Sequence, residues 1–160
     1  MSTESTDLPD EIREALAAHN TLTLAYCDGN GGPQACAVFY AWEQEPDLSP
    51  RLVFLTSRRT RHGQALAAGG GEAAVAFTAQ ADGQHWETIT GLQGRGRCRL
   101  LDGDAWENAR ILYTSRFPFV GAEGNLAQAL ASVDLWEITV DWLRLIDNGK
   151  GFAHKEEWPG

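Results

Sequence analysis

Short strand-like runs, interrupted by helices at irregular intervals, are the feature that most constrains the fold of this chain. Polar and apolar residues alternate over 21–26 and 34–42, on either side of the turn-rich segment 28–33, which predicts a β-hairpin. Similar runs predict further strands at 51–56, 73–80, within 86–101, at 134–140 and at 142–146. Because helices do not alternate regularly with these strands, a doubly wound parallel sheet is disfavoured. We expect an α+β fold, mainly β: an antiparallel split β-barrel of about six strands with peripheral helices.

Helices are predicted where the apolar period lengthens, at 7–20, 60–68 and 104–116. Residues 121–132 form a polar, Ala-rich connection that could also be helical. The first seven residues are polar and acidic, so we expect 1–7 to be disordered and 8–160 to form a single domain.

The charge of the chain excludes some partners. With a net charge of −9 and a pI of about 4.8, it repels phosphate backbones and anionic membranes, so we expect no nucleic-acid and no membrane partner. Three cysteines without CxxC spacing, Cys27, Cys36 and Cys98, predict free, largely buried thiols. Free thiols, and the lack of a signal-like or membrane-length apolar segment, favour the cytoplasm.

A basic cluster stands out against this acidic background. The strand 51–56 runs into Ser57, Arg58 and Arg59, and a helix is expected to begin near Thr60, followed by Arg61 and His62. Hydroxyls, guanidinium groups and the free N–H groups of a helix start are the donors that hold a phosphate. The alternative is a solvated surface loop whose arginines pair with nearby carboxylates, and charge alone favours neither interpretation.

The order of the elements resembles the FMN-binding split barrels related to pyridoxamine 5'-phosphate oxidase, in particular a small bacterial family of unassigned function. The resemblance spans about residues 10–158. The patches that carry it are Ala35 to Tyr40, Arg59-Thr60-Arg61-His62, Arg116-Phe117-Pro118, and Asp147-Asn148-Gly149 followed by Gly151-Phe152.

The resemblance implies FMN as cofactor and a homodimer with the flavin at its interface. It implies that Thr56 and the triplet Thr60, Arg61 and His62 hold the FMN phosphate, with His62 standing where the wider superfamily carries Lys. It also implies that backbone groups of the second strand meet the edge of the flavin ring. The expected cofactor-binding residues are Ala35, Cys36, Ala37, Val38, Leu55, Thr56, Ser57, Arg58, Thr60, Arg61 and His62.

The function implied is a flavin-dependent oxidoreductase of unknown substrate, with NAD(P)H as a candidate electron donor. The alternatives are a non-catalytic flavin or haem carrier on the same fold and an interaction protein with an empty cleft. True pyridoxamine phosphate oxidation is not expected, because the tail from Lys150 to Trp158 lacks an Arg-x-His signature. No residue is assigned a catalytic role, since the flavin would carry the chemistry. The four histidines lack metal-ligand spacing, so no metal site is expected.

Overall fold

Antiparallel strands dominate the computed structural model, which describes residues 6–121, 124, 128–129 and 132–159. The elements in chain order are α1 (Asp10–Ala18), β1 (Thr21–Cys27), β2 (Pro33–Glu43), β3 (Arg51–Thr56), α2 (Arg61–Ala67), β4 (Ala73–Ala79), η1 (Trp86–Thr88), β5 (Thr90–Leu100), α3 (Gly103–Arg116), η2 (Pro118–Gly121), β6 (Asp134–Asp147), η3 (Asn148–Lys150) and β7 (Lys155–Trp158). The predicted disorder of 1–7 falls mostly on residues outside the described ones, as does much of the connection 121–132.

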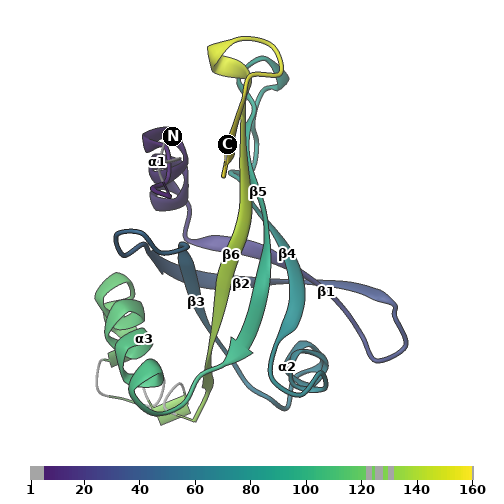
Figure 1. Cartoon of the computed structure of the whole chain (residues 1–160), viewed down its shortest axis with the longest axis vertical. Helices are drawn as coiled ribbons and strands as arrows, with labels where there is room; N and C mark the ends of the chain where they lie inside the picture. The colour runs from purple at the N-terminus through teal and green to yellow at the C-terminus, as the bar shows by residue number, and fades with distance from the viewer. Residues whose placement is uncertain (1–5, 122–123, 125–127, 130–131, 160) are drawn as a thin grey trace.

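Six of the strands close into a barrel. Their order is β3-β2-β1-β4-β5-β6, and β6 pairs back to β3, from Arg51 opposite Thr139 to Thr56 opposite Asp134. All pairings are antiparallel, and β7 pairs with the far half of β6, outside the ring. The predicted antiparallel barrel of about six strands is therefore confirmed (Figure 1).

The core lies inside the barrel because alternate residues of each strand point inward. In β1, Leu22, Leu24 and Tyr26 are buried while their neighbours are more exposed. Helix α1 adds Ile12 and Leu16, both fully buried. A second apolar cluster lies between the outer face of the sheet and α3, and includes Ala41, Val53, Ala109, Tyr113 and Leu135.

The strand β5 lies within the predicted range 86–101, whereas β6 differs from the sequence prediction. The two closing strands expected at 134–140 and 142–146 are one continuous strand, β6. A bulge accommodates its bend: Arg95 pairs with Trp142, whereas Gly96 pairs with Val140. At Gly96 the strands approach so closely that a Cβ atom would lie 2.1 Å from the carbonyl oxygen of Thr139. Strand β7 was not predicted, because its four residues are too short and too polar to show a period.

The burial of the cysteines differs from the prediction of three largely buried free thiols. None of the three forms a disulfide, but only Cys98 is buried; Cys36 is half-buried and Cys27 is exposed. Cys27 is the last residue of β1, beside the turn, so its side chain points outward into solvent. Among the described residues, no helix is long and apolar enough to cross a membrane.

Candidate functional site

The predicted phosphate-binding segment forms a tight corner where β3 ends and α2 begins. The hydroxyl of Thr60 caps α2: its Oγ1 accepts a hydrogen bond from the Gly63 amide at 3.1 Å and donates one to the Ser57 carbonyl at 2.8 Å. The single proton of this hydroxyl is thus used within the chain. Thr60 shapes the corner and has no donor left for a ligand.

Gly63 lets α2 pack directly on the loop. A Cβ atom at this position would lie 2.2 Å from the Ser57 carbonyl oxygen and 2.9 Å from the Arg58 Cα atom. Both contacts are with backbone, which cannot rotate aside. Any residue other than glycine would therefore push the helix start away from the end of β3.

Thr56 and His62 meet inside this corner. Thr56 is 8% exposed, and its Oγ1 lies 2.5 Å from Nε2 of His62. The Thr56 carbonyl accepts a hydrogen bond from the indole N–H of Trp136 at 3.0 Å, which fixes the strand end. Desolvation lowers the pKa of His62, so the imidazole is neutral at pH 7. A neutral, partly buried histidine can gain a proton when an anion binds beside it.

The arginines of the corner differ in how their charge is used. The Arg58 amide donates to Asp134 at 2.9 Å, and its guanidinium Nε lies 3.2 Å from the same carboxylate, so its charge is partly neutralised. Arg59 and Arg61 are exposed and form no ion pair with any described residue. The charge of Arg61 acts toward the β1–β2 turn, where it contributes, after the Gly32 and Asn30 amides, to the lowered pKa of Asp28.

Strand β2 has an open edge next to this corner. Residues 33–39 pair with β1 on one side, whereas pairing with β3 is confined to Tyr40 and the three residues after it. The Tyr40 amide donates toward β1, so by the alternation of an antiparallel strand the backbone groups of Ala35 and Ala37 point to the other side. No described strand pairs with them there.

The register brings this open edge to the corner. Tyr40 pairs with Phe54, which sets Val38 level with Thr56, where β2 and β3 separate. Ala35 and Ala37 are exposed, Cys36 is half-buried and Val38 is buried. A flat group could therefore lie along the edge of β2 with one end at the start of α2.

Most of the residues predicted from the sequence meet here, but not all. Leu55 faces away, packing against the apolar cluster under α3. Sequence reasoning missed Asp134, which belongs to β6 and reaches Arg58 only because the barrel closes. It also missed Gly63, although a glycine in a short predicted helix was a usable signal for close packing. Nothing in the sequence indicated that Tyr26 lies near the site, where its ring centroid is 6.4 Å from that of His62.

The closed six-stranded barrel, the helix that follows its third strand and the hydroxyl-rich corner between them define a protein of the split-barrel class. The chain belongs to the pyridoxamine 5'-phosphate oxidase family, whose family model matches residues 8–147.

Its relatives and structural neighbours agree with this membership. The UPF0306 protein YhbP of Escherichia coli (strain SMS-3-5 / SECEC) is 32% identical over 148 residues, covering 92% of this chain and 90% of its own. A UPF0306 protein of Cronobacter sakazakii is 34% identical over 155 residues, covering 95% of both.

Solved structures with low sequence identity share the fold. A heme binding protein from Mycobacterium smegmatis superposes with a TM-score of 0.69 at 20% identity, over 94% of this chain and 58% of that chain. The conserved hypothetical protein Rv2991 of Mycobacterium tuberculosis gives a TM-score of 0.69 at 19% identity, over 96% and 94%. HutZ, the heme storage protein of Vibrio cholerae, gives 0.64 at 21% identity, over 84% and 90%.

Proposed function

We propose that this protein binds FMN and acts as a flavin-dependent oxidoreductase, as a cytoplasmic homodimer. The observation that carries the proposal is the open edge of β2 beside the corner at the end of β3. An isoalloxazine ring needs backbone donors and acceptors along its polar edge, and Ala35 and Ala37 offer both. The phosphate at the other end of FMN needs cations and hydroxyls, which the corner offers.

The residues of the corner fit a phosphate dianion, but they have different roles: some can contact the phosphate and others hold the shape of the corner. Arg61 is exposed and free of an ion pair within the described chain, so its fork of N–H donors can meet phosphate oxygens. The amides of Arg61 and His62 belong to the first turn of α2, whose N–H groups have no partner within the helix. Thr56 and His62 add polar atoms at the base of the corner. Thr60, Ser57 and Arg58 hold its shape through their own hydrogen bonds.

Bound FMN would supply hydride or electron transfer, with NAD(P)H as the candidate donor, while the chain binds and orients the cofactor. The small side chains of Ala35 and Ala37 leave room for a flat ring to approach the backbone of β2. No residue of the corner needs to act as an acid or base for this role.

Exposed aromatic side chains near the open edge support the proposal that the protein forms a homodimer. Phe39 is 47% exposed although it lies in the middle of a strand, and Phe119 is 49% exposed. Phe117 lies between them, with ring centroids 5.5 Å from Phe39 and 6.1 Å from Phe119. An apolar surface of this kind is typical of a contact between proteins.

A haem-binding or haem-carrying function on the same fold is the second candidate. It is favoured by the structural neighbours whose names state that they bind or store heme. The two candidates make different demands on the corner, because FMN ends in a phosphate whereas haem needs an axial ligand for its iron.

The absorbance spectrum separates the candidates. Purified protein is mixed with FMN or with haemin, freed of unbound ligand by gel filtration, and scanned. We expect a flavin spectrum in the protein peak and bleaching of that spectrum on addition of NADPH or NADH. Retained flavin that neither nucleotide reduces would favour a carrier, and a Soret band with no retained flavin would favour haem.

A further inference from the structure

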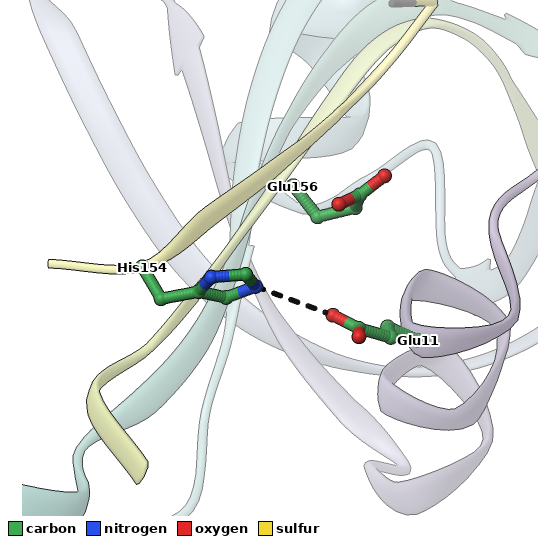
Figure 2. Close-up of side chains that lie close together, drawn as sticks. All are labelled: Glu11, His154 and Glu156. Atoms are coloured by element: carbon green, nitrogen blue, oxygen red, sulfur yellow. Dashed lines mark ion pairs between the residues drawn. The ribbon is translucent and has the colours of Figure 1, made fainter. Parts of the chain in front are cut away.

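A second cluster of chemically active side chains joins the two ends of the chain, on α1 and β7. Glu11 lies in the first turn of α1, His154 immediately precedes β7, and Glu156 lies within β7 (Figure 2). His154 and Glu156 are two residues apart in extended chain, so both side chains point to the same face, toward α1. The indole N–H of Trp158 donates to the Thr6 carbonyl at 2.9 Å, which also ties these segments together.

The three side chains bring ligand atoms together. One nitrogen of His154 and one carboxylate oxygen from each of Glu11 and Glu156 lie within 4.8 Å of one another. His154 Nε2 and Glu11 Oε2 are 3.5 Å apart. In a tetrahedral zinc site with bonds of roughly 2.0–2.1 Å, neighbouring ligand atoms lie about 3.3 Å apart. The His154–Glu11 pair is therefore close to the spacing that a small divalent ion imposes, and the ligand oxygen of Glu156 lies within 4.8 Å of both atoms.

Two of these atoms pair with each other but make no hydrogen bond within the part of the chain that the structure describes. Glu11 Oε2 and His154 Nε2 are buried, and neither makes a hydrogen bond with another described residue. Buried polar atoms are normally hydrogen-bonded, because leaving them unsatisfied costs free energy. The two atoms form an ion pair with each other, drawn as the dashed line in Figure 2, at 3.5 Å, which is long for a hydrogen bond.

Lys150 makes the carboxylate of Glu11 suitable as a ligand. Its ammonium pairs with Oε1 of Glu11, which leaves Oε2 directed at His154. A lysine held on one oxygen of a carboxylate orients the other oxygen toward a ligand.

We propose that Glu11, His154 and Glu156 bind one zinc(II) ion, with water completing the coordination. One imidazole and two carboxylates form a donor set that suits zinc, whereas magnesium and calcium prefer oxygen ligands alone. The site lies apart from the corner at the end of β3 and does not depend on the proposed flavin.

Zinc at this position would fix the strand that forms the wall of a cavity. The chain neighbours of His154, Ala153 and Lys155, line an apolar cavity of ≈ 420 Å³ together with Phe152 and Leu92, and Lys155 is the first residue of β7. Holding β7 against α1 would restrain this wall.

The spacing of the residues explains why the sequence predicted no metal site. Glu11 and His154 come from opposite ends of the chain, and only the pairing of β7 with β6 and the packing of α1 bring them together. Motif searches rely on ligands that are close in the sequence.

Calorimetric titration of the metal-free, untagged protein with zinc chloride tests the proposal. A Cys27→Ser background removes the exposed thiol as a competing ligand. We expect one zinc per chain, and a melting temperature raised by about 5–10 °C when free zinc exceeds its dissociation constant a hundredfold. Replacing zinc by cobalt(II) should give visible ligand-field bands from the same site.

Glu156→Gln and His154→Ala are the diagnostic variants, and each should weaken zinc binding at least tenfold and remove the cobalt bands. Glu157→Gln is the matched control, because Glu157 points to the opposite face of β7 and pairs with Arg144. His85→Ala controls for an exposed histidine elsewhere. Glu156→Gln preserves shape, so it gives the answer even if His154→Ala fails to fold. Zinc binding that is absent from the parent protein, or unchanged in both diagnostic variants, would overturn the proposal.

Discussion

At the scale of single residues, the corner at the end of β3 depends on specific contacts that a substitution would disrupt. Thr60 uses its hydroxyl twice, Arg58 pairs with Asp134, and Gly63 touches the Ser57 backbone. Arg61, like Arg59, forms no ion pair with a described residue, and it lies at the start of α2. The sequence could predict that Thr60 and Arg61 lie together, but it could not predict that their roles differ, since that depends on hydrogen bonds across the loop.

Gly63→Ala should damage the corner without unfolding the barrel. The added methyl group meets the Ser57 carbonyl oxygen, so either the loop or α2 must shift, at a cost of about 1–3 kcal/mol of unfolding free energy. FMN affinity should fall as well, because Arg61 and His62 move with the helix. Urea unfolding and FMN titration measure the two effects. Gly69→Ala is the control, since the nearest atom to its Cβ would be 3.4 Å away; equal behaviour of the two variants would contradict the packing argument.

The three thiols should react at different rates with a chromogenic disulfide at pH 8. Cys27 is exposed and should react fast, half-buried Cys36 more slowly, and Cys98 only after unfolding. Burial raises the pKa of Cys98 to about 12, so almost no reactive thiolate is present in the folded protein. Cys27→Ser should remove the fast phase alone. Two or more fast thiols in the native parent protein would be inconsistent with the structure.

At the scale of elements, local signals were sufficient for the strands whose ends carry turn residues. The hairpin of β1 and β2 was predicted within a few residues, because Asp28 to Pro33 marks the turn and alternation marks both strands. The strand β3 was predicted at its observed bounds from an apolar run. At the bend of β6 the sequence predicts two separate strands, because a bulge with one extra residue interrupts the alternation just as a turn does.

Gly96→Ala should destabilise the protein by about 1–3 kcal/mol, because the new methyl group meets the Thr139 carbonyl oxygen at the bulge. Gly91→Ala, on the same strand, should cost much less, since its Cβ would lie 3.4 Å from a Gln80 side-chain carbon and 3.8 Å from the Ala79 carbonyl oxygen. Chemical unfolding of both variants under identical conditions provides the comparison. A cost for Gly91→Ala equal to that for Gly96→Ala would mean that the bulge is not the source of the strain.

At the scale of the whole molecule, the sequence could predict the fold class, an antiparallel barrel, but not which strands close it. Composition and strand spacing favoured an antiparallel barrel, but the pairing of β3 with β6 joins distant segments and carries no local signal. The open edge of β2 is a consequence of that closure. Strand β3 pairs with β6 along its whole length but with β2 only at residues 40–43, so residues 33–39 of β2 are paired on one side alone. The site is thus a property of the topology as much as of its residues.

The protein should be a dimer in solution. Exposed Phe39 and Phe119 beside the open edge would be covered by a second copy, which removes apolar surface from water. Light scattering coupled to gel filtration should give twice the 17.5 kDa mass of one chain at micromolar concentration. Phe39→Asp should shift the equilibrium toward monomers, whereas Phe152→Asp, at the far end of the barrel, should not. A monomeric parent protein that still retains flavin would contradict the dimer.

The most direct measurement is the affinity of the protein for FMN and for riboflavin, determined side by side by fluorescence titration. If the corner holds the phosphate, FMN should bind at least tenfold more tightly, because riboflavin lacks the group that Arg61 contacts. Arg61→Ala should remove a charge-assisted contact of about 1.5–3 kcal/mol, a loss of roughly tenfold to a hundredfold for FMN. The same variant should leave riboflavin almost unaffected, and Arg110→Ala, on α3, should change neither. Equal affinities for FMN and riboflavin in the parent protein would contradict the assignment.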